Sequence, residues 1–131
     1  VYITSEADLP QKLQKYQLPI PPHILHHLLY YADLYVGDSQ TMASEAGVLG
    51  TPAVRSNTFS GEDNLSYLRE LEEEYDLIYS TTDEEDAFRR IKHIVESDSI
   101  EWENKRQRLL EEKINVSEYL LKLILDQNSI N

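Results

Sequence analysis

The feature that most constrains the fold is an alternation between short apolar runs and segments with helical spacing. The runs are residues 1–5, 34–37, 52–55 and 76–80, and most of their side chains are apolar. Strands that are covered on both faces have this composition, because neither face meets water. Helical segments between successive strands imply parallel pairing. The sequence therefore predicts an α/β fold: a Rossmann-like three-layer domain with a parallel sheet of about four strands and extra C-terminal helices.

Spacing, caps and prolines predict where the helices lie. Prolines suit the first turn of a helix, and a glycine just past the last apolar residue suits its end. A Ser or Thr followed three residues later by Glu is typical of a helix start. These signals predict a helix after Pro21 and Pro22, a second from Ser39 to Leu49 with Gly50 as its C-cap, and a third from Leu65 to Tyr75. A fourth helix runs from a Thr82–Glu85 capping box to Glu96. The rest of the chain, residues 100–131, is predicted to be a helical extension whose last helix is capped by Ser117.

Apolar stripes predict which helix faces are buried. The predicted stripes are Met42, Ala46 and Leu49 in one helix, Leu65, Leu68 and Leu71 in the next, and Phe88, Ile91, Ile94 and Val95 in the third. The nine tyrosines are assigned to packing.

Composition narrows the class of protein. The chain has 131 residues, enough for one domain with a core, and it begins at Val1, so we expect a piece of a longer protein. Twelve basic and 24 acidic residues give a formal net charge of −12, which disfavours nucleic acid as the main partner. The absence of cysteine excludes disulfides, thiolate metal sites and cysteine nucleophiles. We expect a cytoplasmic protein without a transmembrane segment.

Polar side chains follow the second predicted strand, at its junction with a helix. They are Asp38, Ser39, Gln40 and Thr41, and Glu45 lies one helical turn beyond Thr41. In parallel sheets, ligands bind at the carboxyl ends of the strands. The free N–H groups and the dipole of a helix N-terminus favour an anion such as a diphosphate there. A carboxylate one turn further along suits the hydroxyl groups of a ribose.

Other readings of these residues stay open. Ser39 or Asp38 can simply cap the helix while Glu45 is solvated. Arg55, at the end of the third strand, can bind a phosphate or a sugar carboxylate, or can bridge to Asp38 or Glu62. His23 and His27 have a metal-compatible spacing, but no acid accompanies them, so we predict neither a metal site nor a cofactor. His23 is a further candidate for a ligand contact.

The stretch resembles the donor-nucleotide region of the GT-B glycosyltransferase and UDP-N-acetylglucosamine 2-epimerase superfamily. The epimerases carry Asp-Ser-Gly-Gly, a helix with Glu-Ala, then Leu-Gly-x-Pro and a strand that ends in Arg. This chain has residues 38–41, 45–46, 49–52 and Arg55 at matching spacing. The motif Gly-Asp-Ser-x-Thr-Met most resembles the corresponding motif of an uncharacterised prokaryotic family of GT-B-like proteins. The resemblance is convincing over residues 31–56, and the Gly-Gly pair is replaced by Gln40-Thr41.

The resemblance implies a fold, a ligand and a partner. Residues 1–131 would form the C-terminal half of a two-domain GT-B-type protein whose other half supplies the acceptor site. Ser39, Gln40 and Thr41 would contact the diphosphate of a nucleotide-diphosphate sugar, and Glu45 would contact the ribose. The chain would be a fragment of a glycosyltransferase-like or epimerase-like enzyme, inactive alone. The alternative is a degenerate, non-catalytic interaction domain, and the apolar last helix leads us to consider a homodimer.

Overall fold

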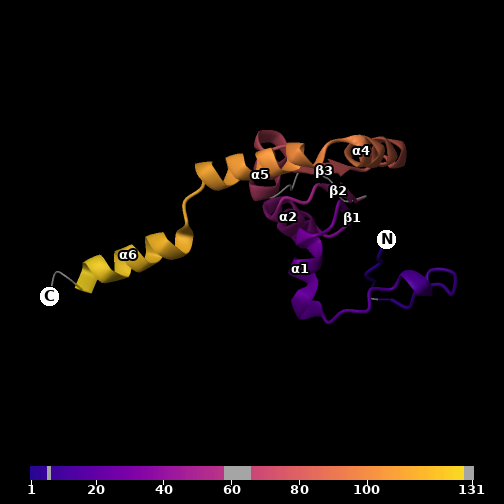
Figure 1. Ribbon diagram of the computed structural model, residues 1–131, viewed down its shortest axis with the longest axis horizontal. Coiled ribbons are helices and arrows are strands. Elements are labelled where there is room, and N and C mark those ends of the chain that lie inside the picture. The colour runs from indigo at the N-terminus through magenta and orange to yellow at the C-terminus, as the bar shows by residue number, and fades with distance from the viewer. Residues whose placement is uncertain (6, 58–65, 129–131) are drawn as a thin grey trace.

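The computed structural model describes residues 1–5, 7–57 and 66–128, and it has α/β architecture (Figure 1). Its sheet has three parallel strands in the order β1-β2-β3, with bounds Tyr35–Gly37, Ala53–Ser56 and Ile78–Thr81. The register aligns Gly37 with Arg55 and Arg55 with Ser80. Three of the four predicted strands are therefore present, and the predicted parallel pairing is confirmed.

The predicted first strand, residues 1–5, is wrong. The structure has only an isolated bridge between Ile3 and Gln17 there. A 3₁₀ turn, η1 (Gln14–Tyr16), brings the chain back beside Ile3, whose N–H donates to the carbonyl of Tyr16. This local turn satisfies the backbone of Ile3, while Val1 and Tyr2 stay exposed. Apolar composition alone therefore did not make this run a member of the sheet.

Helices cover both faces of the sheet. The 3₁₀ turn η2 (Pro22–Ile24) leads into α1 (Leu25–Tyr30), and α1 packs on α2 (Gln40–Leu49). Helix α2, α3 (Ser66–Arg69) and the π-helical turn η3 (Glu70–Glu74) pack on the same face of the sheet. Helix α4 (Glu84–Glu96) covers the other face, over β2 and β3. Helix α5 (Ser99–Glu112) joins the two sides, because Trp102 packs in the α4 cluster and Leu109 in the α2 cluster.

The last helix is separate from this packed body. Helix α6 (Val116–Asn128) projects away from the sheet in Figure 1, and each of its residues from Val116 to Asp126 is exposed. No helix in the described ranges has the length and apolarity needed to cross a bilayer.

Two predicted stripes need correction. In α2 the buried residues are Ala43, Ala46 and Gly47, and Met42 and Leu49 only border the core. In α4 the buried residues are Ala87 and Ile94, whereas Phe88 and Val95 are 63% and 69% exposed. Small residues face the sheet in both helices, Ala43, Ala46 and Gly47 in α2 and Ala87 in α4, and they let each helix approach the sheet closely. Ile94 is buried as predicted. Leu68 and Leu71 are buried as predicted, and Leu65 lies outside the described residues.

Two predicted caps are displaced along the chain. Asp83, not Thr82, caps α4, because its carboxylate accepts the Asp86 N–H at 2.7 Å. The final helix begins at Val116, and Asn115 rather than Ser117 accepts the N–H of Glu118, at 3.2 Å. Asp83 stands one residue after Thr82 and is a more favourable N-cap residue than threonine, whereas Asn115 stands two residues before Ser117 and caps about as well as serine.

The Gly50 cap is confirmed. Gly50 has φ +92°, and its N–H donates to carbonyls at the end of α2. A side chain there would also meet Arg106 of α5. We expect Gly50→Ala to lower the free energy of unfolding by about 1–2 kcal/mol, because a non-glycine residue is strained in the left-handed region. Urea denaturation measures this, with the exposed Val48→Ala as control. Equal stability of the two variants would contradict the assignment.

Candidate functional site

The carboxyl ends of the three strands form one edge of the sheet, and the N-terminus of α2 opens at this edge. Strand β1 ends at Gly37, Asp38 follows, and Ser39 is the N-cap of α2. Because the strands are parallel, Arg55 of β2 and Ser80 of β3 lie in register with Gly37. The structure therefore brings the predicted phosphate-contacting residues together at the place where parallel sheets bind ligands.

Ser39 caps the helix. Its Oγ accepts a hydrogen bond from the N–H of Met42 at 3.3 Å, and its backbone is extended, as in an N-cap. The hydroxyl hydrogen of Ser39 is still a potential donor to a ligand. The N–H groups of Gln40 and Thr41 belong to the first turn, which has no helical acceptors for them. Gln40 is partly buried and Thr41 is exposed.

Tyr35 is a residue of this site that the sequence did not reveal. Burial raises the pKa of its phenol, the negative charge of Asp38 raises it further, and a hydrogen bond from the Ser39 backbone N–H opposes both. The phenol therefore lies at the start of α2. Gly37 makes this arrangement possible, since a Cβ at Gly37 would collide with the Tyr35 hydroxyl. The sequence could have indicated that Tyr35 lies beside Gly37, because residues i and i+2 of a strand lie on the same face of the sheet.

Glu45 lies one turn inside α2 and is partly exposed. Its Oε2 is 3.3 Å from Nε2 of His26 in α1, and 35% of its side chain remains accessible. The carboxylate can thus still accept hydrogen bonds from a ligand. His23, the histidine named from the sequence, is exposed in η2. The register of α1 places His26, not His23, against the acid.

Arg55 is buried, with 1% of its surface exposed. Its Nη1 donates to Oγ of Ser80 at 3.4 Å, and the N–H of Ser80 donates to Oε1 of Glu72 at 2.7 Å. Arg55 shares the sheet face of Ala53, Ile78 and α2. Arg55 therefore lies beneath the edge, where its Nη1 contacts a serine hydroxyl of β3. The two roles considered for it, a ligand contact or a bridge to Asp38 or to Glu62, which lies outside the described residues, stay predictions.

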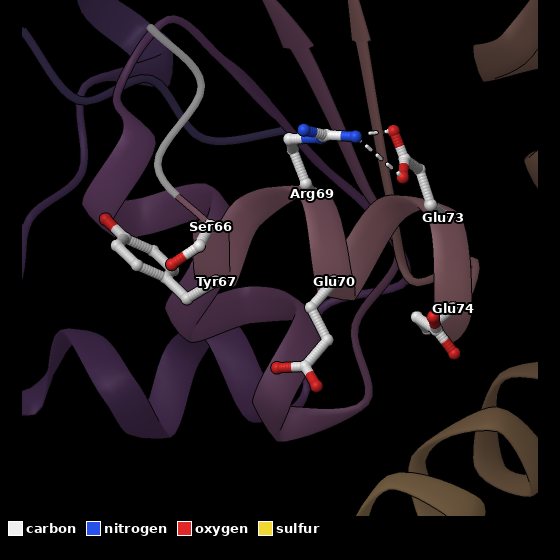
Figure 2. Close-up of a pocket in the computed structure, with 6 residues that line it drawn as sticks. All are labelled: Ser66, Tyr67, Arg69, Glu70, Glu73 and Glu74. Carbon is white, nitrogen blue, oxygen red and sulfur yellow. Dashed lines mark hydrogen bonds and ion pairs between the residues drawn. The ribbon is translucent and has the colours of Figure 1, made fainter.

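A surface hollow of about 440 Å³ lies elsewhere, on α3 and η3. Figure 2 shows that Glu70, Glu73 and Glu74 line it, and that Arg69 reaches across to Glu73, at 3.3 Å. It contains none of the predicted site residues. Its acidic lining repels a phosphate, so it is not the predicted nucleotide site.

Comparison of the chain with protein-family models, with curated proteins and with solved structures finds no match. Within the described ranges, no cluster of three or more histidine, aspartate or glutamate side chains could hold a metal ion. The α2 edge offers backbone N–H groups, hydroxyls, the carboxylates of Asp38 and Glu45, and the nearby phenol of Tyr35.

The buried position of Arg55 makes a testable difference in stability. We expect Arg55→Met to lower the free energy of unfolding by about 2–3 kcal/mol, because Ser80 loses a buried donor. Arg69→Met is the matched control: Arg69 and Glu73 are both exposed, and such pairs contribute ~0–1 kcal/mol. Chemical denaturation of both variants measures the difference. An Arg55→Met chain no less stable than Arg69→Met would show that Arg55 is not a structural residue.

Proposed function

We propose that this domain binds a nucleotide-diphosphate sugar at the N-terminus of α2. The observation that carries the proposal is the position of this helix start, at the carboxyl edge of a parallel sheet, with the accessible carboxylate of Glu45 one turn further along. A diphosphate would accept hydrogen bonds from the N–H groups of Gln40 and Thr41, and the Ser39 and Thr41 hydroxyls would add donors.

Glu45 is the residue that we assign to the ribose of the ligand. Four residues, slightly more than one helical turn, separate Thr41 from Glu45, a rise of about 6 Å. The carboxylate repels phosphate at close range and accepts hydrogen bonds from neighbouring hydroxyls, so it suits the ribose beside the diphosphate. His26, at 3.3 Å, orients the carboxylate from the side of α1.

The role that follows is that of the donor-binding half of a glycosyltransferase or sugar epimerase of GT-B type. The chemical step requires an acceptor site and a base, and we assign both to a second domain of the same protein. In this proposal the present chain binds the nucleotide and does not turn it over.

One observation favours a second function, that of a non-catalytic interaction domain. Side chains at Gln40 and Thr41 stand where the similar epimerases have glycines, and glycines allow phosphate to approach the backbone closely. Ser39 already accepts a hydrogen bond from its own helix. In this alternative the domain keeps the fold and has lost the ligand.

Calorimetry with UDP- and GDP-sugars separates the two functions. We expect saturable binding of one nucleotide class to the chain, and a loss of about 10- to 100-fold in affinity in Glu45→Ala, since a hydrogen bond to a charged group contributes ~1.5–3 kcal/mol. Removal of the ribose 2′-hydroxyl from the ligand should weaken binding to the parent chain, and should weaken it much less in Glu45→Ala.

Glu96→Ala is the control for the loss of one negative charge, because Glu96 is exposed at the far end of α4. It should bind as the parent chain does. Absence of binding to every nucleotide sugar would favour the interaction domain, and equal binding by the parent chain and Glu45→Ala would exclude the proposed ribose contact.

A further inference from the structure

The side chain of Tyr35 runs along β1 and ends at the edge where we place the ligand. Successive residues of a strand are about 3.3 Å apart, so a tyrosine side chain that leans along its strand reaches roughly the level of the second residue beyond it. The Tyr35 hydroxyl lies over Gly37, the last residue of β1, in the space that a Cβ would fill. The ring packs against the cluster beneath α2, which places the hydroxyl between the sheet and the start of that helix.

The Tyr35 hydroxyl uses its oxygen as an acceptor and leaves its proton for another group. Its oxygen accepts a hydrogen bond from the backbone N–H of Ser39, the N-cap of α2. Asp38 acts on the phenol through its charge and not through a hydrogen bond. Among the residues that the structure describes, none accepts the phenolic proton. Because a half-buried tyrosine hydroxyl usually has a partner for its proton, a ligand oxygen at this edge is a suitable acceptor.

The phenol is a neutral donor in a place where charges oppose each other. Burial raises the pKa of the Tyr35 phenol and the charge of Asp38 raises it further, so the group keeps its proton through the neutral range. The same Asp38 carboxylate is exposed beside the helix start, where it repels an anion. The N–H groups of the first turn of α2 act against this repulsion, and a hydroxyl donor on the sheet side adds to them.

We propose that the Tyr35 hydroxyl is a further ligand contact of this site and donates a hydrogen bond to a phosphate oxygen of the nucleotide. This inference rests on the proposed function, because it requires a diphosphate at the first turn of α2. It adds a donor that belongs to the sheet, whereas Ser39, Gln40 and Thr41 belong to the helix start. Gly37 then serves the site as well, because a side chain there would occupy the place of the phenol.

Calorimetry with inorganic pyrophosphate tests the contact. Tyr35→Phe keeps the ring and removes only the hydroxyl, so we expect about 10-fold weaker binding, the lower end of the effect of a hydrogen bond to a charged group. Tyr79→Phe is the matched control, because it removes a half-buried tyrosine hydroxyl from β3 on the α4 face of the sheet. This control should bind as the parent chain does. Circular dichroism of each variant confirms that it is folded.

Gly37→Ala tests the same contact without removing the hydroxyl. The new methyl group displaces the phenol from the start of α2, so the affinity for pyrophosphate should fall by a similar factor. A chain that carries both Gly37→Ala and Tyr35→Phe should bind about as weakly as either single variant, because the two changes remove one and the same contact.

A spectroscopic signal separates a ligand contact from a purely structural role. With ¹³C at Cζ of the nine tyrosines, the signal that is missing from Tyr35→Phe should shift on addition of pyrophosphate, and that of Tyr79 should not. A parent chain that binds neither pyrophosphate nor a nucleotide sugar would contradict the proposed function, and the role of Tyr35 with it. A parent chain that binds pyrophosphate no better than Tyr35→Phe does, or whose Tyr35 signal does not shift, would overturn the role of Tyr35 alone.

Discussion

The parallel pairing of β2 with both of its neighbours is the constraint on which the rest of the structure depends. A parallel sheet must be covered on both faces, because its connections return over them and its strands are apolar on both sides. Ala53 and Val54, adjacent in β2, point into the two separate clusters. Helix α2 therefore has to lie on one face and α4 on the other, and α5 has to cross between them. The N-terminus of α2 is held at the carboxyl edge as a consequence.

This constraint explains why structural residues lie directly beneath the proposed site. Gly37 has no side chain, and Tyr35 uses the space to reach the start of α2. Arg55 is one step from the edge and yet buried, held through Ser80. The accessible groups at this edge are Asp38, the first turn of α2 and the partly exposed Glu45. The proposed diphosphate and ribose contacts use groups at this edge, so ligand binding would not require the core to open.

The parts of the fold that depend on local pattern could be predicted from the sequence, and the parts that depend on packing could not. Three strands, their parallel pairing and the Gly50 cap follow from short apolar runs that alternate with helical segments and from the position of a glycine. The buried face of α4 could not be predicted in this way, because the four apolar residues of the predicted stripe fill a wide arc of the helix. Packing against Val54 of β2 determines that Ala87 and Ile94 are the buried ones. Periodicity also could not place His26 against Glu45, because the two lie on different helices.

The central claim is that the first turn of α2 is the anion-binding element of this domain. The most direct measurement is a ¹⁵N–¹H correlation spectrum of the chain during titration with UDP. We expect the largest shifts in the backbone amides of Gln40 and Thr41, with smaller shifts at Glu45. Inorganic pyrophosphate should shift the amides of Gln40 and Thr41 and leave Glu45 unchanged. Shifts centred on the acidic hollow around Glu70 and Glu73, or a spectrum that does not change, would contradict the claim.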